Sequence, residues 1–182
     1  MKNIETKTLI LALVMLVVVV LMSALLRIDI KYQEQVSGYW TLGDVGVYLS
    51  AVLLGGPLGA LVSGLGSALS DIFVGQAIYA PASLVIKAVM AFVFSLYIKK
   101  RERAVITLIK GLCLCGGIMV AGYFVYDLLI RGNYVLAAIG LPFNLLQLIG
   151  AGLVSLPVLL LAGGKTYAKE DASSTLTQRQ LK

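Results

Sequence analysis

The residues of this 182-residue chain that could do chemistry are a few charged and amide side chains inside long apolar stretches. They are Asp44, Asp71, Lys87, Asp127, Asn144 and Gln147. Such side chains can hydrogen-bond the polar groups of a small molecule, and two carboxylates can also act as an acid and a base. Because ionisable groups are costly inside a membrane and usually mark a function there, these residues are the first candidates for a site.

The spacing of the candidates places several of them on shared helix faces. Asn144 and Gln147 are three residues apart, and Tyr123 and Asp127 are four apart, so each pair lies on one side of a helix. Aromatic residues gather near the ends of the apolar stretches, namely Tyr39, Trp40, Tyr79, Tyr126 and Tyr134. An aromatic ligand would stack on Trp40 or on a tyrosine, and an interfacial aromatic belt is the alternative interpretation.

Lys87 has two open roles, a ligand contact or a structural ion pair with Asp71 or Asp127. Catalytic roles are limited because the chain contains no His, which removes His-based triads and His metal sites. The two cysteines, Cys113 and Cys115, match no metal or redox spacing. We therefore expect no catalytic residue, no metal site and no cofactor.

The composition identifies the solvent in which these side chains must be positioned. The chain is 59% hydrophobic and 13% charged, against about 45–50% and about 25% in soluble domains. Apolar runs cover residues 8–26, 42–54, 58–74, 80–98, 105–130 and 136–162. The predicted fold class is an all-α integral membrane protein with six transmembrane helices, and a re-entrant second segment would leave five. Residues 1–165 form one domain, and 166–182 a short polar cytoplasmic tail.

The basic residues predict the orientation. With a cytoplasmic N-terminus, eleven of the 15 Lys and Arg residues fall on the cytoplasmic side and three, Arg27, Lys31 and Arg131, on the outside. The positive-inside rule then places both termini in the cytoplasm, with residues 99–103 as a topology anchor. In this orientation the polar membrane residues all lie in the outer part of the bilayer. The pattern predicts a polar cavity that opens outward and is closed below by apolar packing.

Several segments, taken in order, resemble a known family over residues 5–165. They are Gly38-Tyr39-Trp40-Thr41-Leu42-Gly43-Asp44, Gly55-Gly56-Pro57-Leu58-Gly59, Gly64-Leu65-Gly66-Ser67-Ala68-Leu69-Ser70-Asp71 and Tyr79-Ala80-Pro81-Ala82-Ser83 with Lys87. Together they resemble the substrate-specific S components of energy-coupling factor (ECF) vitamin transporters, in the branch that includes the hydroxymethylpyrimidine, pyridoxine and riboflavin S components.

The resemblance implies a binding subunit of the bacterial plasma membrane rather than an enzyme. Such a subunit captures a vitamin from outside and delivers it through a transmembrane T subunit powered by two cytoplasmic ATPases, with no nucleic acid involved. Family members often carry Ala-x-x-x-Ala in the first helix for docking the T subunit. In this chain Ala12 is followed four residues later by Leu16, so the docking position is altered.

The predicted ligand is a small aromatic vitamin or precursor, with hydroxymethylpyrimidine favoured and pyridoxine or riboflavin as alternatives. The expected binding residues are Asn144, Gln147, Lys87, Trp40, Tyr39, Tyr79, Asp71, Asp127 and Tyr123. Two functions of other classes compete with this one. A small intramembrane enzyme would use Asp71 and Asp127 as an acid–base pair. A stand-alone secondary transporter would have polar groups near the middle of the membrane and an inverted repeat.

Overall fold

The computed structural model describes residues 5–32, 35–99 and 105–180, and the side chains of residues 5–28, 39–99, 105–135 and 137–161. Residues 100–104, most of the predicted topology anchor, lie outside the described part. The elements in chain order are α1 (Thr6–Leu25), β1 (Arg27–Tyr32), β2 (Gln35–Thr41), α2 (Gly43–Leu53), α3 (Gly56–Phe73), the 3-10 helix η1 (Ala77–Tyr79), α4 (Ala80–Lys99), α5 (Val105–Arg131), α6 (Tyr134–Ile139) and α7 (Leu141–Gln180).

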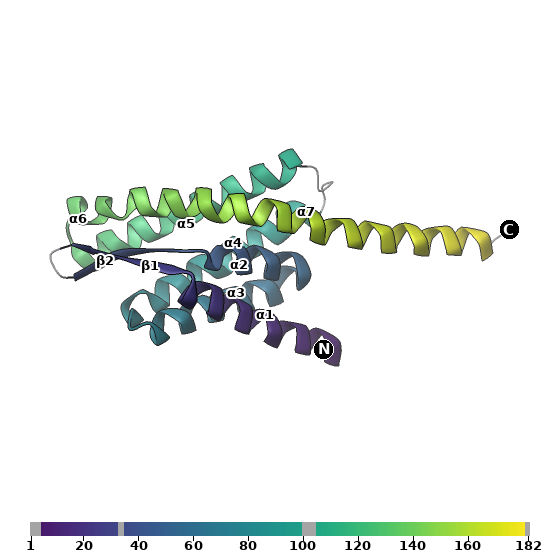
Figure 1. Cartoon of the computed structure of the whole chain (residues 1–182), viewed down its shortest axis with the longest axis horizontal. Helices are drawn as coiled ribbons and strands as arrows, with labels where there is room; N and C mark the ends of the chain where they lie inside the picture. Colours follow the sequence, from purple (N-terminus) through teal and green to yellow (C-terminus); the bar gives the residue numbers. More distant parts are fainter. Residues whose placement is uncertain (1–4, 33–34, 100–104, 181–182) are drawn as a thin grey trace.

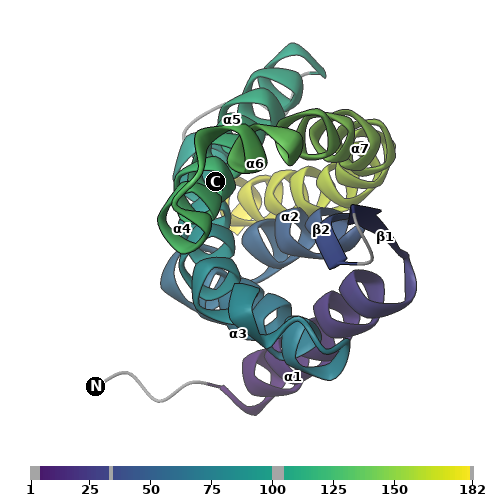
Figure 2. The ribbon, with the colours of Figure 1, turned by 90° about the vertical axis from the view of Figure 1, so that its left-hand side faces the viewer.

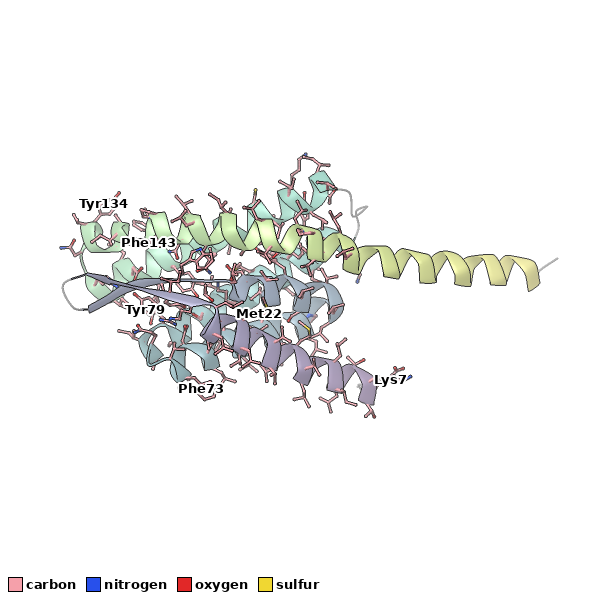
Figure 3. All side chains as sticks on the ribbon, viewed as in Figure 1. Lys7, Met22, Phe73, Tyr79, Tyr134 and Phe143 are labelled. Atoms are coloured by element: carbon pink, nitrogen blue, oxygen red, sulfur yellow. The ribbon has the colours of Figure 1, made fainter. Side chains whose placement is uncertain are left out.

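The helices form an elongated bundle with two different ends. Figure 1 shows the two ends of the chain at one end of the bundle, and the β1–β2 hairpin, η1 and α6 at the other. The side-chain view agrees, with Tyr79, Tyr134 and Phe143 at the hairpin end and Lys7 at the opposite end (Figure 3). Seen along the bundle, α2 lies in the middle and contacts α1, α3, α4 and α7 (Figure 2).

The helices have the length and surface of membrane spans. Four segments of the described part are long and apolar enough to cross a bilayer: 6–25, 77–99, 105–131 and 137–161. Large apolar side chains such as Leu13, Leu129 and Leu153 remain more than half exposed on their outer faces, where lipid would contact them. The prediction of an all-α integral membrane protein is confirmed. The α2 helix has only 11 residues, about 16 Å at 1.5 Å per residue, so the count of six spans stays a prediction.

The break between α2 and α3 follows from two glycines and a proline. Gly55 has a φ of +69° and Gly56 a φ of +33°, which side chains with a Cβ rarely adopt. Pro57 occupies the first turn of α3, where its missing N–H costs nothing. The predicted break at residues 55–57 is therefore where the chain turns to start α3.

Between the apolar runs 8–26 and 42–54, strands β1 and β2 form an antiparallel hairpin. Its register pairs Arg27 with Thr41 and Asp29 with Tyr39, with an irregularity after Ile30. β-Branched and aromatic residues in this segment favour strands. The hairpin lies close to α7 and ends directly before α2, so it holds Tyr39 and Trp40 over the bundle.

The last apolar run, 136–162, is divided and extended in the structure. The short helix α6 ends at Ile139, and α7 starts at Leu141 and continues to Gln180. The predicted tail of residues 166–182 is thus helical up to residue 180, as a continuation of α7. Pro157 lies within that helix.

Candidate functional site

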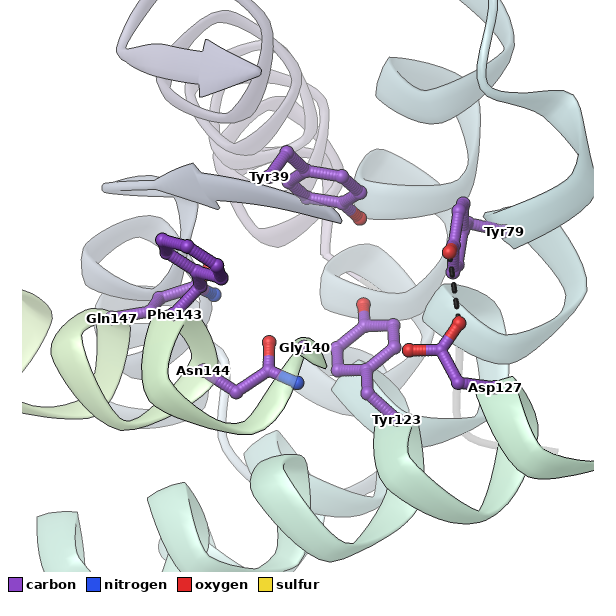
Figure 4. A pocket seen from close by; sticks show the side chains of 8 residues that line it. All are labelled: Tyr39, Tyr79, Tyr123, Asp127, Gly140, Phe143, Asn144 and Gln147. Carbon is purple, nitrogen blue, oxygen red and sulfur yellow. Dashed lines mark hydrogen bonds between the residues drawn. The ribbon is translucent and has the colours of Figure 1, made fainter. Parts of the chain in front are cut away.

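A pocket opens at the hairpin end of the bundle, between β2, η1, α5 and α7 (Figure 4). We call it the hairpin-end pocket, and it is lined by Tyr39, Tyr79, Tyr123, Asp127, Gly140, Phe143, Asn144 and Gln147. Its free volume is about 20 Å³, which is room for about one water molecule. The lining side chains must therefore move to admit any larger ligand.

One wall of the pocket carries a carboxylate whose charge is balanced. The Tyr79 hydroxyl donates to Asp127 Oδ1 over 2.8 Å, and Arg131 Nε lies 3.3 Å from the same oxygen. Arg131 also donates from Nη2 to the Tyr79 hydroxyl over 2.8 Å. Asp127 and Arg131 are one helical turn apart on α5, so the helix itself brings the two charges together.

A second cluster of polar side chains lies behind Tyr39. The Tyr39 hydroxyl donates to Asp71 Oδ1 over 2.9 Å, and the Ser83 hydroxyl donates to the other carboxylate oxygen. Arg27 Nη1 lies 3.6 Å from Asp71, and its guanidinium stands 3.8 Å above the centre of the Tyr39 ring. Burial raises the pKa of the Tyr39 hydroxyl well above its ordinary value, so this group stays protonated and donates.

Ser83 connects this group to the pocket wall formed by α5. The Ser83 and Tyr123 hydroxyls lie 2.7 Å apart, within hydrogen-bond distance. Both residues are buried, as is Asp71, which is 3% exposed. Asp71 thus lies beneath the pocket lining and fixes Tyr39 from behind.

A third cluster of polar side chains lies deeper and joins α2, α4, α5 and α7. Lys87 forms an ion pair with Asp44, and its Nζ lies 3.2 Å from the Met119 sulfur. Gln147 Nε2 donates to Asp44 Oδ2 over 2.8 Å, and its Oε1 accepts from the Thr41 N–H over 3.3 Å. The sequence analysis gave Asp71 or Asp127 as the structural partner of Lys87. That choice was wrong, because α2 lies between the other helices and brings Asp44 to Lys87.

Asn144 is the polar lining residue without a fixed partner. Its side chain is half-buried, lines the pocket and has no hydrogen bond within the part of the chain that the structure describes. Figure 4 shows it extending from α7 toward the side of the pocket that Tyr123 forms. A primary amide offers two donors and one acceptor. Asn144 therefore presents unused hydrogen-bonding groups to whatever enters.

The structure brings most of the predicted site residues together. Six of them line the pocket: Tyr39, Tyr79, Tyr123, Asp127, Asn144 and Gln147. Asp71 and Lys87 lie beneath the lining. Trp40 does not line the pocket, because it lies against Gly150 of α7, where an added Cβ would come within 2.8 Å of the indole ring.

Two lining residues, Gly140 and Phe143, were missed by sequence reasoning. Gly140 directly precedes α7, and Phe143 lies in its first turn. The spacing of four residues between Gly140 and Asn144 was the available signal for Gly140, since residues four apart lie on the same side of a helix.

The two first-helix residues expected at a docking surface lie on the side of α1 that packs against the bundle. Ala12 is 6% exposed and packs with Met15 of its own helix and Val62 of α3, and Leu16 packs partly buried against the same cluster. The exposed side of α1 carries other residues, among them Leu13 and Val17. The structure thus places Ala12 where it joins α1 to α3.

Comparison with known proteins supplies the family. The model of the ECF-type riboflavin transporter S component family matches residues 3–168. No curated protein matches the chain. S components are vitamin-binding membrane subunits of transporters rather than enzymes, and they work with T and ATPase subunits. Since the match includes the whole membrane bundle and the pocket within it, the chain belongs to the ECF-type riboflavin transporter S component family.

Proposed function

We propose that the hairpin-end pocket binds riboflavin and that the protein captures this vitamin from outside a bacterial cell. The observation that carries the proposal is the amide of Asn144, which makes no hydrogen bond with the described residues and faces a pocket walled by aromatic rings. A flavin offers a flat ring to such walls and ring nitrogens and carbonyls to such an amide. The family to which the chain belongs, the riboflavin transporter S components, supports the choice of ligand.

The aromatic walls suit a planar ring. Tyr39 and Tyr79 meet edge to face, with ring centroids 5.9 Å apart and planes at 89°. Phe143 and Tyr123 line the same space from α7 and α5. Offset stacking and edge contacts with a bound ring are worth about 0.5–1.5 kcal/mol per pair beyond the area that they bury.

The polar side of the pocket suits a chain of hydroxyl groups. Asp127 accepts from Tyr79 and lies beside Arg131, which balances its charge. A carboxylate has about four acceptor positions, so it can still accept from a ligand hydroxyl. We assign this side of the pocket to the sugar-alcohol chain of riboflavin, and Asn144 to its ring.

A smaller ligand, hydroxymethylpyrimidine, is the second candidate. The sequence analysis favoured it, and the free volume of about 20 Å³ supports it, because a single pyrimidine ring requires less rearrangement than a three-ring flavin. Its ring nitrogens and amine would pair with Asn144 in the same way. Pyridoxine falls between the two in size.

We propose that the pocket opens outward and that delivery needs partner subunits. Both ends of the chain lie opposite the hairpin end, as cytoplasmic termini require. Below Lys87 and Asp44, the buried core consists mainly of apolar side chains such as Met90, Phe94 and Leu108. This floor blocks a polar path through the protein alone. A T subunit and two ATPases would then supply the movement that releases the vitamin inward.

A titration distinguishes the ligands. The purified protein, in detergent, is titrated into riboflavin while the fluorescence of the flavin is followed, and hydroxymethylpyrimidine and pyridoxine are added as competitors. Riboflavin should bind with its fluorescence quenched by the tyrosines, and neither smaller ring should displace it at equal concentration. Tight binding of hydroxymethylpyrimidine with no binding of riboflavin would reverse the assignment.

A further inference from the structure

Gln147 lines the pocket, yet its amide is already used by the protein. Both Nε2 hydrogens have acceptors, Asp44 Oδ2 at 2.8 Å and the Met119 sulfur at 3.2 Å. Its Oε1 accepts from the Thr41 backbone N–H at 3.3 Å. The side chain is 2% exposed, whereas Asn144, one turn earlier on α7, is half-buried and has no such partner. The two amides of one helix face thus have different roles.

The chemistry of the neighbours fixes the orientation of the Gln147 amide. The Thr41 N–H can only donate, so the atom that faces it must be the oxygen. The Asp44 carboxylate, which forms an ion pair with the Lys87 ammonium, accepts, so the nitrogen must face Asp44. Reversing the amide would set two donors against each other and two acceptors against each other. Lys87 therefore acts on Gln147 through Asp44.

The Thr41 N–H is the point at which the hairpin meets α7. Thr41 is the last residue of β2, and its hydroxyl donates to the Ser23 carbonyl at the end of α1 over 3.1 Å. The Gly43 N–H, in turn, donates to the Thr41 hydroxyl over 3.1 Å. Thr41 is thus held by α1 on one side and by Gln147 on the other, two residues after Tyr39.

We propose that Lys87, Asp44, Gln147 and the Thr41 N–H form a bridge that positions the end of β2, and with it Tyr39, over the pocket. We call it the Gln147 bridge. It rests on the proposed function in that it regulates the same pocket. Gln147 and Lys87 are then positioning residues, and they set how long the vitamin stays bound without using their polar groups on it. For Gln147 this assignment differs from the direct contact that the sequence analysis expected, and for Lys87 it follows the ion-pair alternative that the sequence analysis left open.

Hydrogen exchange in the absence of ligand tests the bridge by itself. The full chain in detergent is compared with Gln147→Met, which keeps the length of the side chain and removes its amide. The Thr41 amide should exchange about tenfold faster in the variant, which corresponds to the loss of about one hydrogen bond. The change should be confined to residues 35–41. Unchanged exchange at Thr41 would overturn the proposal, and faster exchange throughout α2 and α4 would show a general structural role instead.

Dissociation of the ligand tests the consequence for binding. Gln147→Met should release riboflavin about tenfold faster, and lumiflavin, which lacks the sugar-alcohol chain, faster by the same factor. If Gln147→Met changed the release rate of only one of the two ligands, Gln147 would contact that ligand directly, and the positioning role would be overturned. If Gln147→Met does not fold, Gln147→Asn is used, because its shorter side chain cannot reach both Thr41 and Asp44.

The control variant separates this proposal from the proposed function. Asn144→Leu should weaken vitamin binding and leave the exchange of Thr41 unchanged. If the parent protein binds no riboflavin, the proposed ligand is wrong. The hydrogen-exchange result still tests the Gln147 bridge, because it is measured without ligand. Hydroxymethylpyrimidine then replaces riboflavin in the dissociation experiment.

Discussion

At the hairpin end of the bundle the buried side chains of α4 and α5 include Ser83, Lys87, Tyr123 and Asp127, whereas further along the same two helices most are apolar, such as Met90, Phe94, Leu108 and Leu112. The polar side chains are grouped, and almost every donor and acceptor among them has a partner. Polar groups in a membrane are costly one by one, and grouping reduces that cost. The contrast teaches that, in the described part of the chain, buried charged and amide side chains gather near the pocket, whereas the buried polar residues further along are serines such as Ser50 and Ser95.

Asn144 differs from the other polar side chains at the hairpin end. It is a polar group at the polar end that the structure leaves without a partner in its described part. Further along α4 and α5, the buried core of the described residues is formed mainly by apolar side chains such as Met90, Phe94 and Leu108. A polar side chain that makes no hydrogen bond within the described protein therefore indicates a binding site better than buried polar side chains in general do.

The largest expected effect concerns which end faces outward. In a background without Cys113 and Cys115, a cysteine at position 37 in the hairpin should react fully with an impermeant thiol reagent added outside cells. A cysteine at position 102, which lies outside the described residues, should react only after the cells are permeabilised. The reason is the excess of basic residues at the end opposite the hairpin. The reverse labelling pattern would show that the hairpin end faces the cytoplasm, so that the pocket could not open to the outside.

Breaking the buried ion pair should cost the most stability. Lys87→Met leaves the Asp44 carboxylate, which is 1% exposed, without its charged partner. We expect a loss of about 3–5 kcal/mol in the free energy of unfolding, measured by thermal unfolding in detergent. The double variant Lys87→Met with Asp44→Leu removes both charges and should recover most of that loss. Failure to recover would show that packing, not charge, holds this end together.

A close approach between α3 and α4 should show the next largest effect. A Cβ added at Gly64 would lie 2.5 Å from the Leu84 carbonyl oxygen, so Gly64→Ala must push the two helices apart. We expect a loss of about 1–3 kcal/mol in the free energy of unfolding. Gly117→Ala on α5 is the matched control, because nothing lies within 4 Å of the added Cβ. The control should leave the melting temperature unchanged or slightly raised, since Ala favours helix over Gly.

The smallest change in free energy should be the most informative about the ligand. Asn144→Leu removes an amide that makes no hydrogen bond within the described residues, so the melting temperature should stay nearly the same. Vitamin binding should weaken at least about tenfold, which corresponds to about 1.4 kcal/mol. Binding as tight as that of the parent would mean that the contacts must be sought among Asp44, Asp71 and the tyrosines.

Helical periodicity explains what could be predicted of the site from the sequence. Asn144 with Gln147, and Tyr123 with Asp127, recur at three or four residues, so their common orientation follows from the geometry of one helix. The structure places all four at one pocket. The break at Gly55 was equally local, because it depends on the conformational freedom of glycine and not on distant contacts.

Lateral packing explains what could not be predicted. The partner of Lys87 depends on which helix lies beside α4, and that helix proved to be α2, with Asp44. Trp40 was expected to stack on a ligand, but the register of the hairpin presents it to Gly150. The packing of α1 against α3, which buries Ala12, also depends on which helices are neighbours. None of these neighbours is specified by spacing along a single element.

The narrowness of the hairpin-end pocket also has a kinetic consequence. Since its free volume is about 20 Å³, a vitamin cannot enter until Tyr39, Phe143 or their neighbours have moved aside. Only the open fraction of molecules is then competent to bind, and the apparent dissociation constant equals the intrinsic one divided by that fraction. At high vitamin concentration the observed association rate should stop rising and level off at the rate of opening. That plateau is a property of the protein alone, and it should have the same value for every ligand that the pocket accepts.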